Sequence, residues 1–175
     1  TVSCITGSGK SGNKSSTTQS ENAKQTLVIG GSGPLTGDYA QYGISVKQGA
    51  KLAEEEINAN GGVNGIMFDV KIEDDQADPA MAVNAYATLY DEGMKVSIGG
   101  ITSGACIAAS EEAYKDGMLM ITPSGSQKEC TKYDNAFRIC FTDPDQGVYS
   151  ARFIKDNGLS NNVAILYDKS NDYST

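Results

Sequence analysis

The sequence contains no histidine and no tryptophan, and its apolar runs are short. Histidine is the commonest general base, so its absence excludes Ser–His and Cys–His catalytic pairs and any histidine-ligated metal site. No apolar run approaches the roughly 20 residues that a membrane-spanning helix needs. We therefore predict a protein that is not an enzyme and that carries no cofactor or metal.

Acidic residues dominate the charge of the chain. The formal net charge is −8. Residues 1–25 hold three lysines and one glutamate, a charge of +2, so the remaining residues carry −10. Because nucleic-acid binding depends mainly on neutralising phosphates, an acidic body of this kind predicts no nucleic-acid partner.

Near the start, GSGKS (7–11) resembles the end of a phosphate-binding loop. That loop requires a glycine five positions before Gly9, where this sequence has Cys4. Too few residues precede it for a strand, and Ala23 is the only apolar residue in the 15 residues from Ser11 to Gln25. We interpret residues 1–24 as a flexible polar tether and not as a nucleotide site.

The tether begins next to a cysteine. Val2-Ser3-Cys4 resembles the end of a bacterial lipobox, in which a lipidated cysteine begins the mature chain, although Thr1 stands where leucine is usual. The resemblance implies that Cys4 is a lipid anchor; the alternative is an ordinary free cysteine. The chain starts without methionine and stops soon after an apolar run, so we expect a longer protein.

Beyond Gln25, strand and helix signals alternate. Val46, Ala50, Ala53 and Ile57 form one helical stripe, and Asp78-Pro79 is a typical helix start. We expect strands at 26–31, 66–74, 95–100, 118–122, 135–141 and 162–168, and helices at 44–62, 79–92, 106–116 and 146–158. This alternation predicts an α/β fold with a doubly wound, mostly parallel sheet, whose ligands bind beyond the carboxyl ends of the strands.

Six stretches in order resemble the leucine/isoleucine/valine-binding family of ABC-transporter solute receptors, which have the type I periplasmic-binding fold. They are GPLTGDYAQYGISVKQGAKLA, EINANGGVNG, DDQADPAMAV, IGGITSG, MITPSGS and FRICFTDPDQG. The resemblance implies two α/β lobes that close on a ligand. Residues 25–142 would be the N-terminal part of lobe one, and 143–175 the crossover and the start of lobe two.

The same resemblance implies the site and the partners. Ser103 and Ser126 would bind the carboxylate of a branched-chain or similar apolar amino acid, and Ser124 would help to bind its ammonium. Tyr42 and Tyr173 would form the walls, and the family's acidic ammonium contact lies beyond Thr175. The receptor would be a monomer outside the cytoplasm, as a cell-surface lipoprotein or in the periplasm, and would deliver its ligand to a membrane permease.

Three cysteines remain. Cys106 and Cys130 follow successive predicted strands and so lie at the same end of the sheet, which predicts a disulfide between them. Cys140 lies inside a predicted strand, where a thiol behaves as a small buried hydrophobe. Sequence alone does not fix the connectivity, and three reduced thiols are the alternative.

Other interpretations stay open at this stage. Ser103 could simply cap a helix. Asp74, Asp75 and Asp78 could suggest a calcium site, but the EF-hand spacing is absent, and a solvated turn with a helix cap fits better.

The chain could be the ligand-sensing domain of a receptor or regulator with the same fold. A nucleotide-dependent enzyme is disfavoured, because Gly31, Gly33 and Gly37 miss the dinucleotide spacing by one residue.

Overall fold

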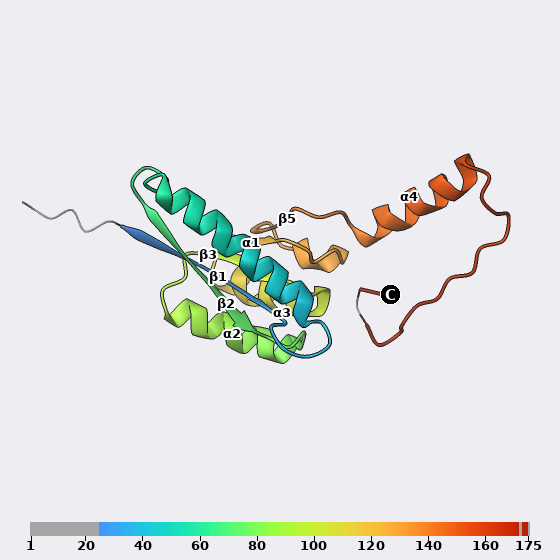
Figure 1. Ribbon diagram of the computed structural model, residues 1–175. Coiled ribbons are helices and arrows are strands. Elements are labelled where there is room, and N and C mark those ends of the chain that lie inside the picture. Colours follow the sequence, from blue (N-terminus) through green and yellow to red (C-terminus); the bar gives the residue numbers. More distant parts are fainter. Residues whose placement is uncertain (1–24, 172, 175) are drawn as a thin grey trace, which may run out of the picture.

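A computed structural model describes residues 25–171, 173 and 174 of the chain (Figure 1). The predicted tether and its anchor Cys4 lie outside these residues. The described strands form one parallel sheet in the order β2-β1-β3-β4-β5. Their bounds are β1 Thr26–Gly33, β2 Met67–Asp74, β3 Val96–Gly100, β4 Met120–Thr122 and β5 Ala136–Arg138. The predicted α/β fold with a parallel sheet is confirmed.

Helices cover both faces of this sheet. Those that pack on it are α1 (Ala40–Ala59), α2 (Pro79–Asp91) and α3 (Ser103–Lys115). They are followed by the short 3₁₀ helix η1 (Lys128–Thr131) and by α4 (Asp143–Asp156). Figure 1 shows α1 on one side of the sheet and α2 on the other, where α2 contacts α3. The chain moves from β1 to β2 in one direction and then crosses back to β3, so right-handed connections place α1 and α2 on opposite faces.

Local signals set several of the helix ends. The Asp78 side chain accepts a hydrogen bond from the Met81 backbone N–H at 2.9 Å, and the next residue is a first-turn proline, as predicted. Gly61 and Gly62 follow α1 with φ of 89° and 77°, a conformation that favours glycine. The start of α1 differs from the prediction, because the helix begins at Ala40 and so includes Tyr42.

The apolar core lies mainly under α2 and α3. Its buried cluster comprises Tyr86, Leu89, Met94, Cys106, Ala113, Met118, Met120, Cys130 and Ala136. By contrast, Gly43 is the only buried residue of α1. The sheet is therefore held to α2 and α3 by apolar burial, and α1 needs other contacts to fix its position.

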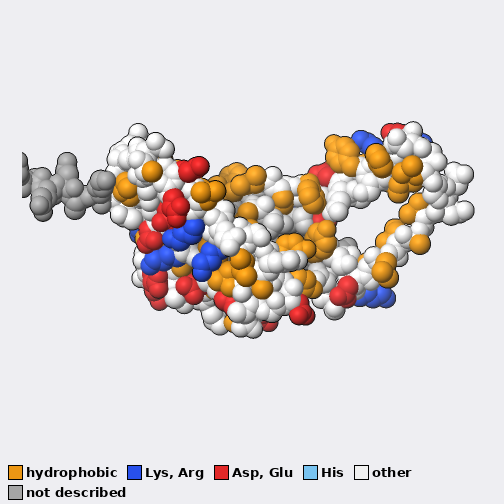
Figure 2. Space-filling view, viewed as in Figure 1, with side chains coloured by type: hydrophobic (Ala, Val, Ile, Leu, Met, Phe, Trp, Pro, Cys, Tyr) orange, Lys and Arg blue, Asp and Glu red, His pale blue; other side chains and the backbone are white. Residues whose placement is uncertain are grey.

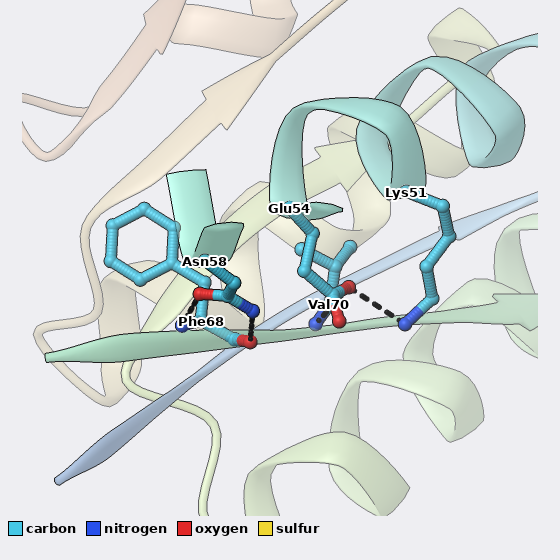
Figure 3. Close-up of polar contacts among 5 residues, drawn as sticks. All are labelled: Lys51, Glu54, Asn58, Phe68 and Val70. Atoms are coloured by element: carbon cyan, nitrogen blue, oxygen red, sulfur yellow. Dashed lines mark hydrogen bonds and ion pairs between the residues drawn. The ribbon is translucent and has the colours of Figure 1, made fainter. Parts of the chain in front are cut away.

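Polar side chains supply those contacts for α1 (Figure 3). The Asn58 side-chain amide donates to the Phe68 carbonyl and accepts from the Phe68 N–H, both at 2.8 Å. One Glu54 carboxylate oxygen accepts from the Val70 N–H at 3.0 Å and pairs with the Lys51 ammonium at 2.7 Å. Because β2 is an edge strand, these bonds satisfy backbone groups that no neighbouring strand reaches.

The C-terminal part stands away from the sheet (Figure 1). No residue of α4 is buried, and Figure 2 shows exposed apolar side chains on this helix and on the segment that returns from it. The predicted strand at 162–168 is wrong: these residues form no strand, and Ile165 and Leu166 are 84% and 100% exposed. A strand needs a hydrogen-bonding neighbour, and no described strand lies beside this segment.

The division into two lobes at residue 142 stays a prediction. Within the described residues, no helix combines the length and the apolarity that crossing a bilayer requires.

Candidate ligand-binding site

A cavity of about 610 Å³ opens at the carboxyl ends of the strands. Loops after β1, β2, β3 and β4 line it, and so do described residues of the C-terminal segment, among them Asp168 and Tyr173. β2 and β3 leave β1 in opposite directions at this edge, which is where open α/β sheets bind ligands. The lining residues are Tyr39, Tyr42, Ala77, Pro79, Ile101, Thr102, Ser103, Gly104, Ser124, Ser126, Phe141, Asp168, Ser170, Asn171, Tyr173 and Ser174.

All five residues predicted to contact ligand lie on this one cavity. Ser103 and Ser126 are buried, at 5% and 3% exposure. Tyr42 and Tyr173 are 58% and 51% exposed and approach from α1 and from the C-terminal segment. The topology therefore brings together residues that are up to 131 positions apart in the sequence, and their role towards a ligand stays a prediction.

The beginning of α3 presents polar groups to the cavity. The helix starts at Ser103, and Thr102 is its N-cap, so the reading of Ser103 as a capping residue is wrong. Thr102 makes no side-chain capping bond, and its hydroxyl is buried without a hydrogen-bonding partner. The first N–H groups of a helix have no partner within the helix and favour an anion. Thr102 is a site residue that the sequence reasoning missed.

A second loop, residues 122–127, meets the first across the cavity floor. The Ser124 hydroxyl donates to the Ile101 carbonyl at 2.6 Å, and the Thr122 hydroxyl donates to the Gly100 carbonyl at 3.0 Å. Because the Ser124 hydroxyl already donates its hydrogen bond to Ile101, the backbone carbonyl of Ser124 is the group that would make the predicted contact with an ammonium. These bonds fix the spacing between the two serine loops.

The lining also carries a negative charge. Among the described residues that line the cavity, Asp168 is the only one with an ionisable carboxylate, and no lysine or arginine is present. Hydrogen bonds from the Ser170 hydroxyl and N–H hold the pKa of Asp168 below its ordinary value. A hydroxyl-rich side and an anionic side together suit a zwitterion. Sequence reasoning missed Asp168 because it treated residues 162–168 as a strand.

The acidic turn after β2 supports the cavity wall. Asp74 accepts from the Leu35 N–H at 2.8 Å and the Gln76 N–H at 3.0 Å, and also from the Thr36 hydroxyl. Burial raises the pKa of Asp74, but these hydrogen bonds outweigh it, so the pKa lies below its ordinary value. Asp74 thereby joins the loop before Tyr39 to the loop that holds Ala77.

Asp75 differs from the prediction of a solvated turn, because it is fully buried. Its carboxylate accepts from the Ala77 N–H at 2.9 Å, and desolvation raises its pKa. Gln76 and Ala77 have φ of 50° and 61°, a strained conformation for residues with side chains. No group of acidic residues among the described positions is arranged to hold a metal ion.

Cys106 and Cys130 lie close to the serine loops. Cys106 and Cys130 are fully buried free thiols, and the Cys130 sulfur lies 3.7 Å from the Ser103 carbonyl oxygen. The hydrogen bond between the two thiols lowers the pKa of Cys106 and, with burial, raises that of Cys130. Their contact fits the predicted disulfide, which stays a prediction. Cys140 lies beyond the end of β5 and is half-buried, so its placement inside a strand is wrong.

Comparison with known proteins decides the family. The family model described as periplasmic binding protein matches residues 26–174. The chain belongs to this family. The chain is 35% identical over 145 residues to Leu/Ile/Val-binding protein homolog 2 of Brucella abortus. The aligned region covers 82% of this chain and 39% of that relative.

Two further relatives agree. The leucine-, isoleucine-, valine-, threonine- and alanine-binding protein of Pseudomonas aeruginosa is 37% identical over 149 residues, with 84% of this chain and 40% of that protein covered. The isoleucine complex of the substrate-binding protein LivJ from Streptococcus pneumoniae superposes with a TM-score of 0.71 at 34% identity, over 75% of this chain and 38% of that one. The periplasmic binding protein chain thus spans about 40% of the length of these relatives.

Proposed function

We propose that this chain is the N-terminal part of an extracytoplasmic receptor that binds a branched-chain or similar apolar amino acid for an ABC importer. The observation that carries the proposal is the uncapped start of α3, where the buried Thr102 hydroxyl has no partner beside the cavity. A ligand carboxylate satisfies such donors. The relatives, which are named for binding leucine, isoleucine and valine, support the same ligand class.

In this proposal, the polar groups of the cavity divide between the two ends of the ligand. The Ser103 and Ser126 hydroxyls and the first N–H groups of α3 donate to the carboxylate. The Ser124 carbonyl and the Asp168 carboxylate face the ammonium. Tyr42 and Tyr173 cover the apolar side chain of the ligand from opposite sides.

The setting of the receptor is part of the proposal. Cys4 anchors the mature chain to a membrane lipid, and residues 5–24 let the receptor reach its permease. The receptor binds as a monomer and changes no bond in its ligand.

Calorimetry of the full-length protein against the twenty amino acids tests the ligand class. We expect heat of binding with leucine, isoleucine or valine. No binding to any of the twenty would refute the amino-acid assignment.

Ser103→Ala in the full-length protein tests the site itself. The hydroxyl donates to a carboxylate, so its removal costs roughly 1.5–3 kcal/mol, about a ten- to hundredfold loss of affinity. Ser110→Ala is the matched control, because Ser110 is fully buried on the same helix but does not line the cavity. Equal affinities for the two variants would contradict the role of Ser103.

A further inference from the structure

The guanidinium of Arg138 gathers more hydrogen bonds than any side chain on the cavity lining, although it is not itself on that lining. Arg138 is the last residue of β5 and is half-buried. Its Nη1 donates to the carbonyls of Gly125, Ser126 and Gln127 at 3.3, 2.8 and 2.9 Å. Its Nη2 donates to the Lys128 carbonyl at 3.4 Å and the Thr131 hydroxyl at 2.6 Å.

Three consecutive carbonyls that converge on one point repel one another unless a cation lies between them. The positive charge of Arg138 therefore stabilises a backbone conformation that the loop alone would not keep. The same loop carries Ser126, whose carbonyl also accepts from the Asp143 N–H at 3.1 Å. The loop is thus bonded both to β5 and to the beginning of α4.

The direction of these carbonyls fixes the direction of the neighbouring N–H groups. A trans peptide points its C=O and its N–H to opposite sides, and the described residues contain no cis peptide bond. Since the Gly125 and Ser126 carbonyls point at Arg138, the N–H groups of Ser126 and Gln127 point away from it. The Gln127 N–H indeed approaches the Ser103 hydroxyl oxygen, at 3.4 Å. That oxygen belongs to the other serine loop of the cavity.

We propose that Arg138 is a positioning residue for ligand binding: it turns the peptide groups of residues 125–127 so that Ser126 faces the cavity and the Gln127 N–H holds the Ser103 hydroxyl in place. This inference rests on the proposed function. Arginine is required because its two nitrogens reach opposite ends of the loop in one plane, whereas a lysine ammonium occupies only one point. The chain has one other arginine, Arg152, which is exposed on α4.

Affinity for L-leucine and L-isoleucine in the full-length protein gives the first test. We expect Arg138→Gln to weaken binding on the order of ten- to hundredfold, because a displaced Ser126 loses about one charge-assisted hydrogen bond to the ligand carboxylate. Arg138→Lys should recover only a small part of this loss. The control Arg152→Gln should bind as the wild type does. Wild-type affinity in folded Arg138→Gln or Arg138→Lys would overturn the proposal.

Two further measurements separate positioning from general stability. Amide hydrogen exchange in residues 125–131 should accelerate in Arg138→Gln while exchange in α2 stays unchanged. Methylguanidinium should restore part of the affinity of Arg138→Ala, which a loss of folding would not allow. Uniformly faster exchange, or no rescue, would overturn the proposal. If Arg138→Gln and Arg138→Ala do not fold, Arg138→Lys supplies the affinity and exchange readouts.

Failure of the proposed function would look different. If the wild type binds no amino acid, the ligand class is wrong. The exchange comparison between Arg138→Gln and Arg152→Gln still decides whether Arg138 orients the loop. Unchanged exchange in residues 125–131 would then reject the inference on its own.

Discussion

A disulfide between Cys106 and Cys130 would join the two halves of the cavity floor covalently. Cys106 lies in the first turn of α3, three residues after Ser103, and Cys130 lies in η1, four residues after Ser126. Both thiols are fully buried, and each shifts the pKa of the other. Packing around them is close: a Cβ added at Gly125 would lie 2.8 Å from the Cys106 sulfur. Oxidation removes two protons and two electrons from the pair, which an added disulfide such as oxidised glutathione accepts.

The expected gain in stability follows from the loop that the bond would close. A loop of roughly 25 residues loses denatured-state entropy equivalent to about 3.5 kcal/mol at 25 °C. Urea unfolding of the oxidised and the dithiothreitol-treated protein should differ by this order. Because the folded thiols are inaccessible, reduction should require unfolding or a long incubation.

Two variants assign the bond. Cys130→Ala should unfold identically with and without reductant, whereas Cys140→Ala should keep the full difference. Mass spectrometry after alkylation under denaturing, non-reducing conditions should find Cys140 modified and the other two protected. Alkylation of Cys106 and Cys130 in protein that was purified without reductant would refute the pairing.

Two other predictions concern buried polar groups. Burial raises the pKa of Asp75, so its charge costs stability above the folded-state pKa, and this cost disappears as the pH falls below about 3.9. Asp75→Asn should therefore raise the free energy of unfolding at pH 8, with the gain fading towards pH 4; an equal gain at both pH values would contradict the charge argument. Asn58→Ala leaves both Phe68 backbone groups without their side-chain partner and should cost about 1–3 kcal/mol in urea unfolding. A change below about 0.5 kcal/mol would mean that water replaces the amide.

Much of the fold could be predicted because its signals are local. The Asp78-Pro79 start of α2 needs only nearby backbone, and the structure confirms it. The strand expected at 66–74 is also present as β2, in which the alternate residues Val70 and Ile72 are buried. The failures have non-local causes. Residues 162–168 have strand composition, but pairing depends on a neighbouring strand, which composition does not reveal.

The candidate site shows the same division. The serine loops could be predicted because glycine- and serine-rich turns follow apolar strands. Thr102 was missed, since which of two adjacent hydroxyl residues begins the helix depends on one backbone angle. Arg138 could not be predicted, because a single arginine in a strand pattern says nothing about carbonyls ten to thirteen residues earlier in the chain. Asp75 was predicted to be exposed because aspartate is usually found on the surface, but the backbone of the turn after β2 buries it.

The contacts between α1 and β2 have a consequence beyond holding the helix. The Asn58 side chain offers the same donor and acceptor as a peptide group, and it meets Phe68 as a residue of a sixth strand would. The Glu54 carboxylate accepts a hydrogen bond from the Val70 N–H, the next N–H of β2 that points away from β1. Where these two side chains sit, the border of the sheet is already paired, so an extended segment from another molecule finds no free backbone to join. Side chains of α1 thus close this part of the β2 edge to the intermolecular pairing that begins strand exchange and fibril growth.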